Sequence, residues 1–387
     1  MQDVFVIEAL RTPFGSLGGA LASITAPRLA ATVIEALVRR SGVDAARVDE
    51  VVVGQVLPAG VGQAPARQAM RLAGLPDEIP ATTINKVCGS GLAAMQLAAM
   101  SIRTGAAEIA VAGGMESMSL APYLLARARQ GYRLGNGDLL DGLVHDGLRD
   151  AYDGRHMGQI ADAAAVRHGI GREEQDAFAA RSYGLACGAV ESGVLEPELV
   201  PVEVRGERVA RDEEPFRASV ERLPGLRPAF GAGGTVTAGN ASSLSDGAAL
   251  ALLAGERAVN RFGLRPRARL AAYATSSTAP ERFTDAPVEA VRRACAAAKL
   301  SPRDVDVWEI NEAFSLVPLI AMRELELQLE RVNVNGGAVA LGHPLAASGG
   351  RLVATLVREL HRRSARFGVV TLCIGGGEAV AAVLERV

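Results

Sequence analysis

Two distant stretches of the chain repeat one order of features. Residues 88–96 (CGSGLAAMQ) lead to 110–117 (AVAGGMES), and residues 345–355 (LAASGGRLVAT) lead to 373–380 (CIGGGEAV). In each stretch Ser-Gly begins a helical pattern, a buried strand follows, and a Gly-Gly-x-Glu turn is expected to close the unit. This weak internal repeat predicts two βαβ-type halves related by a pseudo-two-fold axis, each with a parallel or mixed sheet and helices on its faces.

Strand and helix patterns alternate along both stretches. Short apolar runs indicate strands, and one longer apolar segment in each stretch indicates a helix. We expect strands at 4–9, 49–57, 108–114, 305–313 and 367–377, and helices at 91–105 and 348–363. This alternation places the chain in the α/β class.

The middle of the chain has a different texture. Residues 117–245 contain charged segments that are interrupted by Gly and Pro. This region is too long for a loop and too irregular for a third repeat, so it predicts an inserted, lid-like loop domain. We therefore expect an N-terminal half at 1–265, which includes the insertion, and a C-terminal half at 266–387.

Composition narrows the class of partner. The 387 residues are 49% hydrophobic and 22% charged, which is typical of a folded globular protein. A net charge of −2 gives no reason to expect nucleic acid or an anionic membrane as a partner. The longest run of small and apolar residues, 91–102, is too short to cross a bilayer.

The first residues already form a strand pattern, so we expect no targeting segment and a cytoplasmic location. In that reducing compartment the cysteines are expected to be free thiols. Their wide spacing predicts no metal-binding cluster. They are Cys88, Cys187, Cys295 and Cys373.

Cys88 lies in a turn that is suited to present a side chain. Gly89 and Gly91 permit a sharp turn and a close approach to a ligand, and a helix is expected to begin near Ser90. Helix N–H groups directed at the sulfur would lower the pKa of the thiol and favour a nucleophile. A buried core cysteine is the alternative.

His343 and Cys373 are two further candidates. His343 lies in a Gly- and Pro-flanked loop before the second helix; alone it indicates a structural histidine, but beside a reactive thiol it favours a general base. Cys373 ends a buried strand and meets three glycines, whose N–H groups can stabilise an anion. It occurs in the second half as Cys88 occurs in the first, although a strand-end core thiol is equally compatible with the pattern.

Asn311 lies near the end of the strand expected at 305–313 and could direct its amide into the cleft, directly or through a water. An asparagine that caps the following helix is the alternative.

Seven motifs together resemble the thiolase family. They are NKVCGSGL, VAGGMESMS, HMG, GTVTAGNASSLSDGAA, NEAF, NVNGGAVALGHP and CIGGGEA, and they extend over essentially the whole chain. The forms NKVC, HMG and WEINEAFSLV are most similar to the acetyl-CoA acetyltransferase branch. The resemblance implies a thiolase-like fold and a reversible Claisen condensation of two acetyl-CoA to acetoacetyl-CoA and CoA.

The resemblance also implies roles for individual residues. Cys88 would accept the acyl group, His343 would activate it, and Cys373 would serve as the second acid and base. His343 and a water held by Asn311 would form one oxyanion hole, and the N–H groups of Cys88 and Gly375 would form another.

For substrate binding, Ser242 resembles the residue that contacts the pantetheine arm. His156 and Met157 resemble the pair that lines the acyl pocket, and Phe314 resembles its wall. Arg217, with other arginines of the inserted segment, could attract the CoA phosphates, although a solvated charged face is an equal interpretation.

Three positions depart from the family pattern. Ala346 stands where Gly is common, which would strain the His343 loop if that position needs a positive φ. Ser243 stands where many members have Gly, and Glu378 where biosynthetic members often have Met or Gln.

The resemblance implies CoA thioesters as substrates, no permanently bound cofactor, no metal, and a homo-dimer or homo-tetramer. A degradative 3-ketoacyl-CoA thiolase with a longer acyl tunnel has identical chemistry and remains an alternative. A decarboxylating ketosynthase would have two His, or His and Asn, in place of the second cysteine, so Cys373 argues against it. A non-catalytic acyl-CoA-binding protein would be expected to lack one of the three reactive residues.

Overall fold

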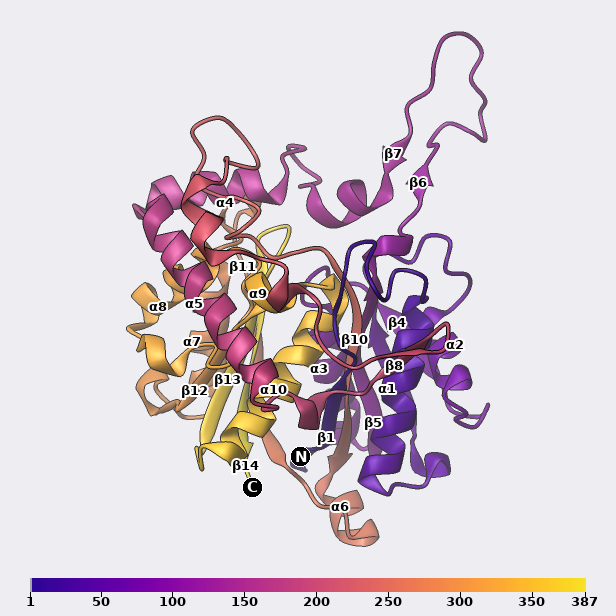
Figure 1. The fold of residues 1–387 in the computed structure, drawn as a ribbon. Helices are drawn as coiled ribbons and strands as arrows, with labels where there is room; N and C mark the ends of the chain where they lie inside the picture. Colours follow the sequence, from indigo (N-terminus) through magenta and orange to yellow (C-terminus); the bar gives the residue numbers. More distant parts are fainter. Residues whose placement is uncertain (1) are drawn as a thin grey trace.

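The computed structural model describes residues 2–387, and its two halves each contain a mixed sheet (Figure 1). In the N-terminal half the strand order is β1-β10-β5-β3-β4, with β2 (Gly15–Ser16) paired to β10. The bounds are Val4–Arg11 for β1, Glu50–Gly54 for β3, Ala81–Ile84 for β4, Ile109–Ser117 for β5 and Ser245–Gly255 for β10. Here β3 runs parallel to β4 and β5, whereas β10 is antiparallel to β5 and β1.

The C-terminal half repeats this order as β11-β14-β13-β12. The bounds are Ala268–Ser277 for β11, Val307–Ile310 for β12, Phe367–Ile374 for β13 and Glu378–Arg386 for β14. A parallel bridge between Trp308 and Val332 takes the place that β4 has in the first half. The two half-sheets are joined only through Phe5–Arg269 and Val6–Ala268 of β1 and β11. The predicted fold class, with two pseudo-symmetric halves and mixed sheets, is confirmed.

Two helices are buried between the half-sheets. They are α3 (Ser90–Thr104) and α10 (Ser348–Arg362), and one apolar cluster contains side chains from both helices and both sheets. The outer face of the first sheet packs on α1 (Ala26–Ser41) and α2 (Pro65–Leu72), and that of the second on α7 (Ala286–Ala297) and α8 (Leu316–Leu325). Both faces of β3 are apolar because each is covered: Val51 and Val53 pack on the outer helices, and Val52 packs on the helices between the half-sheets.

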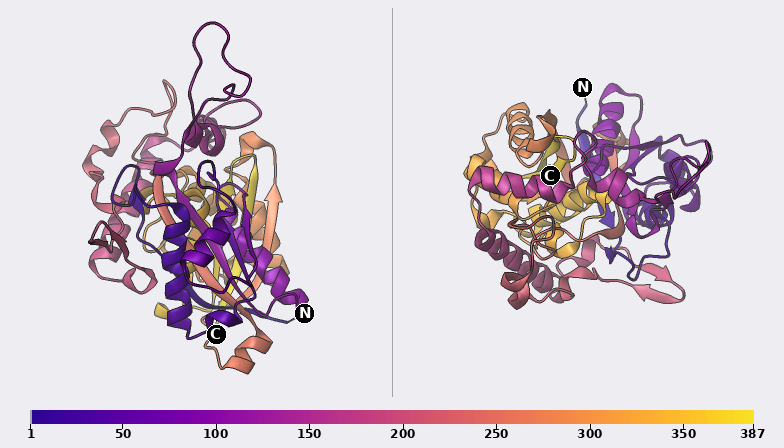
Figure 2. Two further views of the ribbon diagram at one scale, coloured as in Figure 1. Left: turned by 90° about the vertical axis from the view of Figure 1, so that its right-hand side faces the viewer. Right: turned by 90° about the horizontal axis from the view of Figure 1, so that it is seen from above.

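The inserted segment is more helical than its Gly- and Pro-broken sequence suggested. It contains α4 (Met157–His168) and α5 (Arg172–Glu191), together with the short pairs β6 (Tyr123–Leu124) with β7 (Leu140–Asp141) and β8 (Val202–Val204) with β9 (Glu207–Val209). Figure 2 shows that the loop between β6 and β7 projects from the body. Short helices α6 (Glu256–Phe262) and α9 (Ala338–Leu341) complete the fold.

A buried arginine fastens the insertion to the sheet. The guanidinium of Arg11 on β1 is fully buried and lies 2.6 Å from both Glu198 and Asp212 of the insertion. Removal of the arginine would leave two buried carboxylates without their cationic partner, which is strongly destabilising. The insertion is therefore held as part of the folded body.

One predicted turn is wrong. Gly113 and Gly114 lie inside β5 rather than after it. A Cβ at Gly114 would lie 1.8 Å from the carbonyl oxygen of Ala346, so glycine is needed for the close approach of the loop before α10. Only the Gly375–Gly377 segment forms the expected turn, between β13 and β14.

None of the helices within residues 2–387 is long and apolar enough to cross a membrane.

Candidate active site

Cys88 is presented by a strained turn between β4 and α3. Val87 has φ +45°, which is unusual for a β-branched residue. Side chains hold the turn, because Val87 N–H donates to Asn85 Oδ1 at 2.9 Å and Lys86 N–H donates to Ser90 Oγ at 2.8 Å. Backbone strain of this kind persists where the surroundings over-determine it, often at functional sites.

The electrostatic setting of Cys88 differs from the expectation. Burial raises the pKa of its thiol to about 11, although the backbone N–H groups of Gly375 and Cys88 act in the opposite direction. This direction is opposite to the predicted lowering of the pKa, because burial outweighs the N–H groups even though Cys88 is only partly buried. The two N–H groups next to the sulfur belong to the two residues that the resemblance assigns to an oxyanion hole.

His343 is buried with a neutral imidazole. Burial, followed by the nearby Arg351 charge, lowers its pKa to about 3. Nδ1 lies 2.5 Å from Ser348 Oγ, and that hydroxyl is also 3.2 Å from the carbonyl oxygen of Pro344. If the hydroxyl donates to the carbonyl, Nδ1 carries the imidazole proton and Nε2 is free to accept one.

Gly342 sets the backbone direction immediately before His343. Its φ is +98°, and a Cβ there would lie 2.2 Å from Ser245 Oγ. The backbone N–H of His343 donates to the carbonyl oxygen of Ser243 at 3.0 Å. The turn therefore requires glycine at 342 to hold the imidazole in place.

Asn311 lies behind the imidazole rather than at a helix end. Its Nδ2 is 3.4 Å from His343 Nε2, and its buried Oδ1 has no protein partner. Helix α8 begins at Leu316 with Ser315 at its N-cap position, so the helix-capping interpretation of Asn311 is wrong. An Asn N–H directed at Nε2 agrees with the tautomer that leaves this nitrogen unprotonated.

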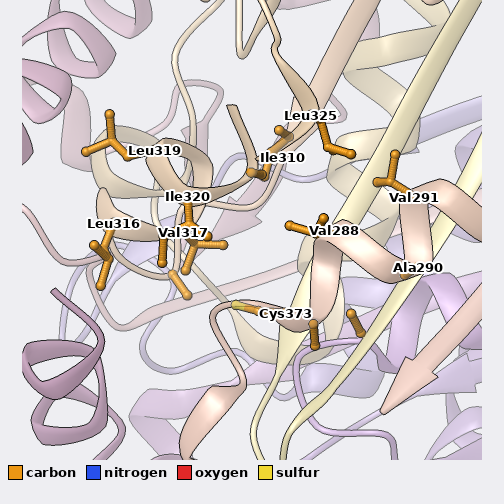
Figure 3. Close-up of a cluster of buried hydrophobic side chains, with 14 of the residues drawn as sticks. Val288, Ala290, Val291, Ile310, Leu316, Val317, Leu319, Ile320, Leu325 and Cys373 are labelled. Atoms are coloured by element: carbon orange, nitrogen blue, oxygen red, sulfur yellow. The ribbon is translucent and has the colours of Figure 1, made fainter. Parts of the chain in front are cut away.

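Cys373 ends β13 at the edge of an apolar cluster formed with α7 and α8. Figure 3 shows it beside Val288 and near the α8 side chains Val317 and Ile320. Burial is the largest cause that raises the pKa of its thiol well above the ordinary value, and the charge of a nearby Cys88 thiolate adds to it. Cys373 is both a core thiol and part of the cavity wall.

The two cysteines do not occupy equivalent positions in the repeat. Cys88 is two residues before the start of α3, and the residue two before α10 is Ala346. Cys373 instead lies on β13, the counterpart of β5. Both thiols line one cavity because the turn before α3 and the end of β13 come together between the two halves.

One cavity of ≈ 360 Å³ brings most candidates together. Cys88, His343, Cys373 and Gly375 line it. Four predicted substrate-binding residues line it as well: Ser242, His156, Met157 and Phe314. Of the predicted catalytic residues, Asn311 is not part of the cavity wall, although its Nδ2 lies next to the His343 imidazole.

The substrate-side residues form a wall that is mostly apolar. His156 caps α4 by accepting from Gly158 N–H at 3.1 Å, and its ring stacks on Phe230 at 4.6 Å between centroids. Phe314 contacts both Phe230 and Phe283 edge to face at 6.3 Å. Ser242 Oγ donates to the carbonyl oxygen of Ala313 at 3.0 Å, which leaves its lone pairs free to accept.

Arg217 lies outside this cavity. Its exposed guanidinium is 3.6 Å from Glu214 and 3.9 Å from Glu213. A role with CoA phosphates stays a prediction.

The structure shows the surroundings of the three residues that depart from the family pattern. Ala346 does not adopt a positive φ, so the loop of His343 is not strained there. Ser243 lines the cavity, with a buried hydroxyl that has no protein partner. Glu378 forms an ion pair with Lys86.

Two of the three phenylalanines of the aromatic wall and the partner of His343 were not predicted from the sequence; Phe314 was. Phe230 and Phe283 come from segments that carry no local signature of a site. Ser348 could have been found, because it is the first residue of the helix that follows His343. Among residues 2–387 no cluster of three or more His, Cys, Asp or Glu side chains could hold a metal ion.

Comparisons with known proteins agree with this geometry. The family model "Thiolase, N-terminal domain" matches residues 4–257, and "Thiolase, C-terminal domain" matches residues 264–386. The chain is 50% identical to acetyl-CoA acetyltransferases of Chromobacterium violaceum and Pseudomonas aeruginosa, over 100% of each chain. A crystal structure of the Bacillus anthracis acetyl-CoA acetyltransferase is 39% identical and superposes with a TM-score of 0.97, covering 100% of this chain and 99% of that chain.

Proposed function

The chain belongs to the thiolase family, and on that premise we propose that it catalyses the reversible condensation of two acetyl-CoA to acetoacetyl-CoA and CoA. The observation that carries the proposal is the convergence of Cys88, His343, Cys373 and the Gly375 N–H on one cavity. The names of the full-length relatives support acetyl-CoA as the substrate.

In the first half-reaction, neutral His343 takes the proton of the Cys88 thiol and the sulfur attacks the thioester carbon. A pKa of about 11 means that the free thiol is protonated at neutral pH, so a base beside it is required. The N–H groups of Cys88 and Gly375 donate to the oxyanion that forms. Collapse breaks the bond to CoA, whose thiolate takes a proton from Cys373, and acetyl-Cys88 remains.

In the second half-reaction, the Cys373 thiolate removes an α-proton from a second acetyl-CoA. The resulting carbanion attacks the acetyl carbon on Cys88, and the sulfur leaves and recovers its proton from His343. His343 and a water held by Asn311 stabilise the thioester oxygen of the carbanion. Burial keeps Cys373 protonated in the free protein, so it has a proton to give to the departing CoA thiolate before it acts as the base.

The aromatic wall favours short acyl chains. Phe230, Phe283 and Phe314 close the cavity with rings that pack on one another. A thiolysis assay with CoA and 3-ketoacyl-CoA substrates of increasing length tests this. We expect the highest kcat/KM for acetoacetyl-CoA and a steep decline with longer chains; equal or rising values would favour the degradative 3-ketoacyl-CoA thiolase.

We include a homo-oligomer in the proposal. Strand β4 lies at an open edge of the sheet, and a groove beside it contains the exposed side chains of Leu97 and Met100. Pairing of two such edges would cover both the unpaired backbone and the apolar groove. Sedimentation of a Leu97→Arg variant would show a monomer if this surface forms the dimer and no change if it does not. A cytoplasmic location and the absence of a permanent cofactor remain expectations.

A further inference from the structure

The proposed site is divided between the two halves of the molecule. The sulfur belongs to Cys88, in the turn before α3, whereas the N–H group beside it belongs to Gly375, in the turn between β13 and β14. An oxyanion hole works only when its donors lie within hydrogen-bond distance of the oxygen that develops charge. Something must therefore fix one turn relative to the other.

Neither turn is rigid by its own sequence. Gly375, Gly376 and Gly377 have no side chains to restrain the second turn, and two of them adopt positive φ (+90° and +85°). The first turn contains Val87 in a strained conformation. Glu378 is the first residue after the glycines that has a side chain, and it begins β14.

Lys86 and Glu378 connect these two turns directly. The ammonium group of Lys86 forms an ion pair with Oε2 of Glu378, two residues before Cys88 and three residues after Gly375. The two side chains are 28% and 38% exposed. Lys86 also lines the groove of Leu97 and Met100, the proposed dimer surface, so sedimentation must show variants of either residue of the pair unchanged in oligomeric state. Neither Lys86 nor Glu378 lines the catalytic cavity. The pair is therefore placed to act on the turns and not on the substrate.

We propose that the Lys86–Glu378 ion pair is a positioning device that holds the Gly375 N–H against the sulfur of Cys88. A partly exposed ion pair contributes little to global stability, so its effect is expected in the geometry of the site. This also explains why Glu378 departs from the family pattern. Its carboxylate pairs with Lys86, which is one of only two lysines in the chain. As a contribution to catalysis the inference rests on the proposed function.

The test is the pH profile of Cys88 alkylation by iodoacetamide, read by intact-protein mass spectrometry in Lys86→Gln and Glu378→Gln. The other titratable side chains of the cavity wall are His156, His343 and Cys373, and the charge of Glu116 also acts on Cys88; all four remain in both variants. If the pair acts only through its charges, loss of the lysine raises the apparent pKa of Cys88 and loss of the glutamate lowers it. If the pair positions the Gly375 N–H, both variants raise it.

Turnover gives the second measurement. We expect either variant to lower kcat for thiolysis of acetoacetyl-CoA about tenfold with little change in KM, since a misplaced donor weakens only the transition state. Lys86→Arg should retain activity, and the exchanged pair Lys86→Glu with Glu378→Lys should recover most of it. The control is Arg269→Gln, which removes ion pairs with Glu385 and Asp3, away from the catalytic turns.

The inference would be overturned if the two variants shifted the Cys88 pKa in opposite directions or not at all. It would also be overturned if the exchanged pair had a kcat no higher than that of the single variants. A loss of activity in Arg269→Gln equal to that in Lys86→Gln would overturn it as well. A wild-type protein with no thiolysis would refute the proposed function, but the alkylation profiles would still decide whether the pair positions the turn.

Discussion

At the residue scale, the side chain of Asn311 makes very few hydrogen bonds to the rest of the protein. Asn311 is buried, yet its Oδ1 has no protein partner and its Nδ2 makes only the 3.4 Å contact with His343. Its truncation therefore removes little that holds the fold together. Its amide is available for catalysis instead.

Asn311→Ala should lower kcat about 10²-fold with a small change in melting temperature, because it removes part of an oxyanion site. The control is Asn333→Ala. That buried asparagine bonds to both backbone groups of Ile310 and to Glu312, so its loss should lower the melting temperature clearly. A large loss of stability in Asn311→Ala with normal turnover per folded molecule would assign Asn311 a structural role.

Cys373→Ala should separate the two half-reactions. His343 can still activate Cys88, so the acetyl adduct should form, whereas exchange of the α-protons of acetyl-CoA for deuterium should be lost. Cys295→Ala, which removes a buried thiol elsewhere in the same core cluster, should leave exchange intact. Unchanged exchange in Cys373→Ala would leave Cys373 as a core thiol only.

At the scale of elements, the loop between α9 and α10 carries His343, the proposed general base. Gly342→Ala combines a positive φ with a clash at Ser245, so it should cost about 1–3 kcal/mol of unfolding free energy and reduce kcat by displacing His343. Gly105→Ala is the control: its φ is +81°, but an added Cβ meets no atom within 4 Å. Denaturant unfolding and activity per folded molecule should show a stability loss in both variants and a catalytic loss only at Gly342.

The elements that could be predicted from sequence are those whose pattern is set by local burial. The expected helices at 91–105 and 348–363 lie within one residue of α3 and α10, because Ser-Gly and the following apolar period mark them. Helix α5 was missed, since its surroundings are charged and irregular. Gly113 and Gly114 were misplaced in a turn because their need for glycine comes from contacts far along the chain, with Ala249 for Gly113 and with Ala346 for Gly114. The aromatic wall depends on similarly distant contacts.

At the scale of the whole molecule, burial makes stability depend on pH. His343 has a folded pKa of about 3, below its ordinary value, so its contribution is present above pH 6.5 and is lost as pH falls toward 3. Glu116 and Glu309 act in the opposite direction. Burial raises their pKa values to about 7 and about 8, so their contribution is present in acid and is lost as pH rises through those values.

The difference in unfolding free energy between wild type and His343→Asn isolates the imidazole. Between pH 7 and pH 5 the wild type should lose about 2 kcal/mol of unfolding free energy relative to the variant. The loss is about 1.4 kcal/mol per pH unit below pH 6.5. Urea unfolding at the two pH values measures it. A difference that stays flat between the two pH values would contradict a buried neutral histidine.

The account as a whole rests on an acyl group held by Cys88, and intact-protein mass spectrometry after incubation with acetyl-CoA alone tests this most directly. We predict one added acetyl group that maps to Cys88, is greatly weakened in Cys88→Ala, and persists in Cys187→Ala and Cys295→Ala. An acetyl adduct on Cys187 or Cys295 with none on Cys88 would contradict the account.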